Sequence, residues 1–113
     1  MGVRETTISA LIRRAIARDG RALVTRNNTG VLLDSNGRPV RFGLGRGSPD
    51  LVGMLLGSGR VFCLEVKQPG RAPTPHQRAW ARACRMRGGF VATVHSVPEA
   101  LAALERALAG GRE

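Results

Sequence analysis

Hydrophobic residues along the chain follow two spacings, one typical of helices and one typical of strands. Ile8, Ile12 and Ile16 recur at helical spacing, which predicts an amphipathic helix over 5–18. The same spacing returns twice, and both later segments open with a residue pair typical of a capping box. The sequence therefore predicts two further helices, over 74–87 and 96–109.

Short apolar runs bounded by turn residues predict the strands. They lie at 22–25, 31–33, 39–42, 51–55, 61–67 and 90–94. Glycine-containing turns at 34–37 and 57–59 each join two neighbouring runs, so we expect two hairpins. A chain of 113 residues has room for one domain, 1–113. The predicted fold class is α/β, a small mixed β-sheet flanked by helices in the order α-β-β-β-β-α-β-α.

The charge balance narrows the possible partners. Lys and Arg number 18 against 8 Asp and Glu, a net charge of +10, which favours a polyanion such as nucleic acid. A packaging protein without chemistry has the same composition. No apolar run approaches the ~20 residues of a membrane span, and the N-terminus lacks a signal-peptide core. We therefore expect a cytoplasmic protein, in a bacterial cell or a phage-infected host, with no membrane partner and with Cys63 and Cys84 reduced in the core.

Polar residues interrupt the most apolar predicted strand near its end. Side chains alternate along a strand, so Glu65 and Lys67 point the same way. Lys67 is the only lysine among the 18 basic residues. A carboxylate and an ammonium group are costly beside apolar neighbours unless they are paired or functional. A plain ion pair at a strand end would also explain them.

Asp50 adds a second carboxylate to this place. It follows Pro49 and precedes the 51–55 strand, and folding the hairpin brings it toward Glu65. Two carboxylates beside one lysine form a site of hard oxygen ligands suited to Mg²⁺. Taken alone, Asp50 is also an ordinary turn residue after proline.

These residues carry a resemblance to a known family. Pro49-Asp50 followed by Glu65-Val66-Lys67 resembles the signature of the PD-(D/E)xK nucleases, and the wider pattern resembles the VRR-NUC (virus-type replication-repair nuclease) branch. The resemblance runs from about Glu5 to Leu108. Four motifs carry the resemblance. They are an early helical glutamate (Glu5), an Arg-Asn segment (26–30), a Gly-x-Pro-Asp loop (47–50), and a Pro-Gly loop that leads to a helix with a Gln (68–77).

The resemblance implies a restriction-endonuclease-like core that hydrolyses DNA phosphodiesters with Mg²⁺ or Mn²⁺. Asp50, Glu65 and the Val66 carbonyl would hold the ion. Glu5, in line with the apolar helix stripe, would bind it through water or complete a second ion site. Lys67 would orient the attacking water or stabilise negative charge, and Gln77 would position either. Two structural roles stay open: Glu5 also suits the helix dipole, and Gln77 also suits a capping box.

Arginines near the motifs are expected to contact phosphates without reading sequence. The expected nucleic-acid contacts are Arg46, Arg71, Arg78, Arg26 and Asn28, whereas Arg13, Arg14 and Arg18 fit a solubilising face. The glycine-rich stretch at 43–47 leads into a strand and lacks the end of a Walker A loop, so no nucleotide cofactor is expected.

Stand-alone members of this family resemble phage and bacterial enzymes that act as homodimers on branched DNA. The leading hypothesis is therefore a homodimeric Holliday (four-way) junction resolvase. The alternatives are a flap, nick or general duplex DNA nuclease in phage replication and repair, and a non-catalytic DNA-binding domain of the same fold.

Overall fold

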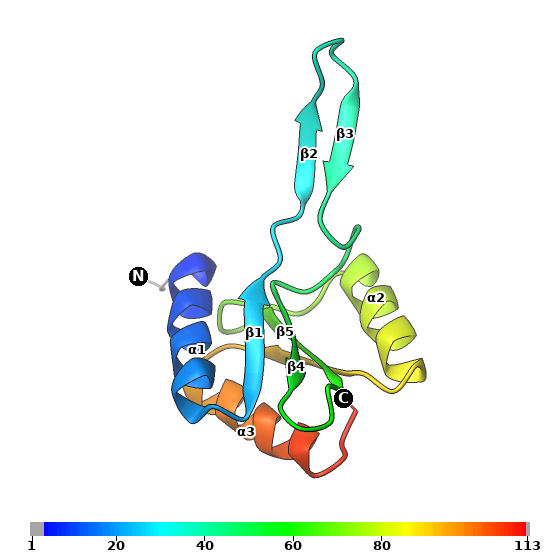
Figure 1. The fold of residues 1–113 in the computed structure, drawn as a ribbon. Coiled ribbons are helices and arrows are strands. Elements are labelled where there is room, and N and C mark those ends of the chain that lie inside the picture. The colour runs from blue at the N-terminus through cyan, green and yellow to red at the C-terminus, as the bar shows by residue number, and fades with distance from the viewer. Residues whose placement is uncertain (1–3, 113) are drawn as a thin grey trace.

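The computed structural model describes residues 4–112, and Figure 1 shows how their elements are arranged. In chain order the elements are α1 (Glu5–Asp19), β1 (Ala22–Arg26), β2 (Gly30–Leu33), β3 (Pro39–Phe42), β4 (Leu51–Leu55), β5 (Val61–Val66), α2 (Pro75–Met86), β6 (Phe90–Val94) and α3 (Val97–Leu108). Each lies where the sequence pattern predicts it. Five strands precede α2, one more than the expected order counts.

Four strands form the main sheet, in the order β1-β4-β5-β6. β4 pairs antiparallel with both β1 and β5, whereas β5 and β6 run parallel because α2 makes the crossover between them. α1 and α3 cover one face of this sheet and α2 lies on the other (Figure 1). The predicted mixed sheet flanked by helices is confirmed.

β5 is buried on both faces, which is why its sequence is almost continuously apolar. Phe62, Leu64 and Val66 pack toward the cluster that includes α1 and α3. Cys63 points the other way, into a smaller cluster with Ala81 of α2. Cys63 and Cys84 are free thiols, and burial raises the pKa of the Cys63 thiol to about 12. Of this strand, only Glu65 carries a charge into the buried layer.

β2 and β3 leave the body as a separate two-stranded hairpin (Figure 1). They pair only with each other in the described part of the chain, and no helix packs over them. Most of their side chains are exposed. None of the helices within 4–112 is long and apolar enough to span a membrane.

Candidate active site

The β4–β5 hairpin brings two carboxylates together at one end of the main sheet. Leu51 pairs with Leu64, so the residues one step further, Asp50 and Glu65, lie opposite each other. The backbone N–H of Val66 donates to Asp50 Oδ2 at 2.7 Å. This bond holds the Asp50 carboxylate against β5, as the predicted hairpin requires.

Glu65 is buried, with only 5% of its surface exposed. Burial raises the pKa of its carboxyl group to about 9, and the hydrogen bond and negative charge of Asp50 add to the rise, while Lys67 opposes it. Near neutral pH Glu65 therefore keeps a proton beside Asp50. Two carboxyl groups this close need a positive partner between them, and here that partner is the proton.

Gln77 connects the start of α2 to this pair. Its Oε1 accepts from the Thr74 N–H at 2.8 Å, and the Gln77 N–H donates to Thr74 Oγ1 at 3.2 Å, which completes the predicted capping box. Its Nε2 donates to Glu65 Oε1 at 3.1 Å. The two roles considered for Gln77 are thus compatible, because each uses a different end of the amide.

The loop that carries Asp50 is held by contacts that are distant in sequence. Asn27 Nδ2 donates to Ser48 Oγ at 2.8 Å and to the Pro49 carbonyl at 2.9 Å, and the Asn27 N–H donates to the Asp50 carbonyl at 2.8 Å. A Cβ on Gly47 would lie 2.3 Å from the His76 carbonyl oxygen, so the loop packs directly on α2. Sequence reasoning did not identify Asn27 as a support. The only sign in the sequence that Asn27 has a role was its position within the Arg-Asn segment, 26–30.

Lys67 and Glu5 lie at the edge of the carboxylate pair. Lys67 follows the last residue of β5, its N–H donates to the Val94 carbonyl at 3.0 Å, and its side chain is half-buried. Glu5 is exposed rather than part of the buried stripe, which begins at Ile8. Its Oε1 accepts from the Gln68 N–H at 3.4 Å, and both Glu5 and Lys67 line a surface hollow of about 550 Å³.

A larger cleft of about 560 Å³ opens above Asp50. Arg26 and Asn28 line it, together with Glu5. Arg13 lines it as well, although its sequence position suggested only a solubilising role. The missed signal was the spacing of Glu5, Ser9 and Arg13, which places them on one face of α1.

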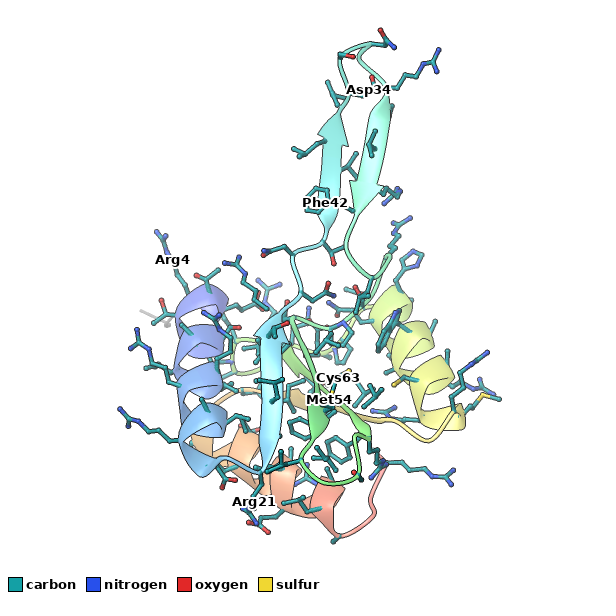
Figure 2. All side chains as sticks on the ribbon, viewed as in Figure 1. Arg4, Arg21, Asp34, Phe42, Met54 and Cys63 are labelled. Atoms are coloured by element: carbon teal, nitrogen blue, oxygen red, sulfur yellow. The ribbon has the colours of Figure 1, made fainter. Side chains whose placement is uncertain are left out.

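The other expected phosphate contacts are spread around this region. Arg71 lines the hollow that contains Lys67, and Arg78 lines a third cavity, of about 220 Å³, which includes Glu65 and half-buried Trp80. Arg46 is exposed on the loop before Asp50. Figure 2 shows basic side chains over much of the surface, so their number alone does not mark one face as the contact surface.

The oxygen ligands expected for a metal are partly assembled. Within residues 4–112, no three His, Cys, Asp or Glu side chains already form a cluster able to hold an ion. Asp50 and Glu65 meet, and Glu5 lines the cleft above Asp50, which does not include Glu65. A buried carboxyl group held against a half-buried carboxylate nevertheless fits a divalent cation, which would replace the proton of Glu65 and bind hard oxygens.

Comparisons with known proteins identify a family and a similar solved structure. A family model described as the VRR-NUC domain matches residues 36–98, which contain Asp50, Glu65, Lys67 and Gln77. A solved structure described as a VRR_NUC domain is 26% identical, with a TM-score of 0.61, and the match covers 89% of this chain and 94% of that one. No curated protein matches the chain. The structural match extends the likeness well beyond the residues that the family model covers.

Proposed function

The chain belongs to the VRR-NUC family of nuclease domains, and we propose that it is a metal-dependent DNA endonuclease whose reacting groups are Asp50, Glu65 and Lys67. Membership implies a nuclease of the PD-(D/E)xK type acting on DNA. The observation that carries the proposal is the buried Glu65 carboxyl group held against Asp50 at the end of β5. Lys67, the only lysine of the sequence, comes directly after Val66, the last residue of β5.

Asp50, Glu65 and the Val66 carbonyl would hold Mg²⁺ or Mn²⁺, with Glu5 acting through water. When bound, the ion polarises a phosphoryl oxygen and lowers the pKa of a water molecule. The chain supplies the positioning. The Val66 N–H fixes Asp50, and the Gln77 amide fixes Glu65. Both carboxylates are therefore oriented before the substrate arrives, which lowers the entropic cost of the reaction.

Lys67 acts on the phosphate or on the attacking water. Its ammonium group is compact and has three donors, whereas a guanidinium is planar and wide. It lies beside the carboxylates, where negative charge develops on the phosphorus-bound oxygens. All the other Lys or Arg positions of the chain are arginine, and the single lysine lies here. This supports a role for Lys67 that depends on the ammonium group itself.

The cleft above Asp50 is the proposed path of the DNA backbone. Arg13 and Arg26 on its walls neutralise phosphates, and Asn28 adds a neutral donor. Arg71 extends the contacts beside Lys67, with Arg46 and Arg78 further out. Phosphate contacts carry no sequence information, so selection rests on the shape of the DNA.

The preferred substrate is proposed to be a four-way junction cut by a homodimer, in the repair of branched DNA within the cytoplasm. A dimer with twofold symmetry presents two active sites to a junction with nearly the same symmetry. Flaps, nicks and plain duplex are the alternatives for a nuclease. A non-catalytic DNA-binding domain is disfavoured by the three intact reacting groups.

A cleavage assay separates these possibilities. An immobile four-way junction, a 5′-flap and a plain duplex are incubated with Mg²⁺ or Mn²⁺ and the wild type, Asp50→Ala, or Asp19→Ala. Asp19 pairs with Arg21 at the end of α1 opposite Glu5 and does not line the cleft, so its removal is the matched control. Paired symmetric cuts confined to the junction, absent only in Asp50→Ala, support the resolvase. Equal cutting of all three substrates would support a nuclease that has no selectivity for junctions. DNA binding without any cutting would contradict the proposal.

A further inference from the structure

His95 joins the end of β6 to two other parts of the molecule. It follows the last residue of β6, and its side chain is half-buried. Its Nδ1 lies 3.0 Å from Glu99 Oε1 in α3, and its Nε2 lies 3.1 Å from the Arg71 carbonyl oxygen. Arg71 belongs to the segment between β5 and α2, called here the Arg71 loop (67–74). The His95 ring therefore fastens this loop to the body of the domain.

Both partners of the His95 ring are hydrogen-bond acceptors. A backbone carbonyl has no proton to donate, and an ionised carboxylate has none either. The hydrogen bond with His95 lowers the pKa of Glu99, so this carboxylate is ionised near neutral pH. A neutral imidazole has one N–H and can serve only one of two acceptors, whereas an imidazolium serves both. The contacts of His95 are therefore those of the protonated ring.

The surroundings of His95 also favour its protonated form. The hydrogen bond to Glu99 and the one to the Arg71 carbonyl raise the pKa of His95 above its ordinary value of 6.5, whereas partial burial opposes the rise. Glu99 is the charged side chain that α3 places against the ring. The neighbouring end of β5 and the Arg71 loop contribute the cations Lys67 and Arg71. His95 should therefore lose its proton close to neutral pH.

The Arg71 loop carries two residues that are expected to act on phosphate. Lys67 and Arg71 line the same surface hollow of about 550 Å³. Arg71 is exposed, so the place of its guanidinium depends on the backbone that carries it. Lys67 has a separate anchor, because its N–H donates to the Val94 carbonyl at 3.0 Å. The bond from His95 therefore acts on the position of Arg71 more than on that of Lys67.

We propose that His95 is a positioning residue for DNA binding, because its protonated ring, held by Glu99, fixes the Arg71 loop so that Arg71 meets a phosphate beside Lys67. This rests on the proposed function, which assigns the hollow to the DNA backbone. Loss of the ring proton removes one of the two hydrogen bonds and frees the loop, and ordering it again on DNA costs entropy. DNA affinity should therefore fall as pH rises through the pKa of His95.

The dissociation constant of an immobile four-way junction, measured by fluorescence anisotropy without metal, tests the proposal. Between about pH 6 and about pH 8 the wild type should lose at least about threefold in affinity. The slope of log affinity against log salt should shrink by about one, as loss of one phosphate contact predicts. Glu65 stays protonated over this range, since its pKa is about 9. His95→Ala should show the weaker affinity and the smaller slope at both pH values.

The matched control is His76→Gln. His76 is the other histidine of the chain and is exposed in the first turn of α2. Its removal should leave the dependence of affinity on pH as in the wild type. Circular dichroism verifies that each variant folds.

Two further variants separate positioning from a merely structural role. Glu99→Gln keeps an acceptor for Nδ1 but removes the charge, so the fall in affinity should move to lower pH. Arg71→Gln removes the cation that His95 positions, so adding His95→Ala to it should cause no further loss. In cleavage assays with Mg²⁺, His95→Ala should raise KM more than it lowers kcat. A structural role for His95 predicts an unshifted midpoint and additive losses instead.

Three results would each overturn the proposal: a wild-type affinity that is constant over this pH range, an unshifted midpoint in Glu99→Gln, or additive losses in the double variant. Failure of the proposed function gives a different result. Binding that depends on pH through His95, without any cleavage, contradicts the nuclease and supports the positioning role. Cleavage with an affinity that does not change with pH supports the nuclease and contradicts the positioning role.

Discussion

The molecule contains two antiparallel hairpins with opposite surroundings. β4–β5 lies in the middle of the main sheet, between α1 and α3 on one side and α2 on the other. β2–β3 projects from the body with both faces exposed. The inner hairpin fixes two carboxyl groups at its end, whereas the outer hairpin holds apolar side chains in water. Two hairpins with similar apolar sequences therefore differ in structure. The inner hairpin holds a packed site, whereas no helix of the described residues packs on the outer hairpin.

The difference comes from what packs on each hairpin. Strand pairing is satisfied in both, so backbone hydrogen bonds do not distinguish them. Helical layers bury β5 from Phe62 to Val66, and that burial raises the pKa of Glu65. Chemistry that needs a low-dielectric site can be built only on the inner hairpin.

Two strand glycines offer the sharpest test of this contrast. A Cβ on Gly53 of β4 would lie 1.6 Å from the Leu23 carbonyl oxygen, a backbone atom that cannot move alone. Gly53→Ala should unfold the domain or cost more than ~4 kcal/mol. Gly30→Ala on β2 meets only the tip of the Phe42 ring and should cost under ~1 kcal/mol. Chemical denaturation measures both, and equal losses would refute the contrast.

Large apolar side chains should separate in the same way. Phe62 of β5 is fully buried and stacks on Phe90 with ring centroids 5.5 Å apart. Phe62→Ala should lower the free energy of unfolding by about 3–5 kcal/mol. Leu33→Ala, on the exposed side of β2, should change it by no more than ~0.5 kcal/mol when measured on the monomer. A large loss at Leu33 would mean that the hairpin packs on its own body.

Substitutions at the turns of the two hairpins should change stability less than those within the strands of the inner hairpin. Arg60, just before β5, donates to the carbonyl oxygens of Gly88 at 2.7 Å and Ala107 at 3.1 Å, near the ends of α2 and α3. Arg60→Ala should cost about 1–3 kcal/mol, because carbonyl groups near the ends of two helices lose their donor. The Asp34 carboxylate accepts from the nearby N–H groups of Asn36 and Arg38, both at 2.9 Å and both within the same turn. Asp34→Ala should leave the melting temperature of the body nearly unchanged, and an equal drop for both variants would contradict this.

The buried carboxyl group should make stability depend on pH. The folded chain keeps the Glu65 proton until pH rises to about 9, whereas the unfolded chain loses it near 4.5. Between these values the unfolded state binds fewer protons, so the free energy of unfolding should fall as pH rises. Glu65→Gln, measured with a chelator present, should flatten this fall. A wild-type profile that rises over the same range would show that Glu65 is ionised when folded.

Much of the inner hairpin could be predicted from the sequence. The 57–59 turn and the two apolar runs set the register, and the register places Asp50 against Glu65. The Thr74 capping box follows from spacing alone. The expected box at Ser96 forms only in part, because the Glu99 carboxylate pairs with His95 Nδ1 at 3.0 Å instead. A local rule fails there because a neighbouring side chain competes.

The surroundings of the hairpins could not be predicted in the same way. The run Val31–Leu33 has the composition of a buried strand, yet β1 pairs directly with β4, which places β2 and β3 outside the main sheet. The role of Asn27 depends on contacts 21 and 22 residues away. Such long-range packing has no local pattern. The fold class and the meeting of Asp50 with Glu65 are therefore accessible from sequence, whereas the supporting contacts and the exposure of the β2–β3 hairpin are not.

The most direct test of the central claim is the single-turnover rate of phosphodiester cleavage by Lys67→Ala and Lys67→Arg, compared with the wild type and with Asp19→Ala. The proposed ammonium role predicts that both Lys67 variants lose at least about a hundredfold in rate, as loss of a group stabilising transition-state charge does. DNA affinity should stay near that of the wild type, since Arg13 and Arg26 of the cleft are proposed to supply most of it. Wild-type rates in Lys67→Ala would contradict the assignment of the reaction to Asp50, Glu65 and Lys67.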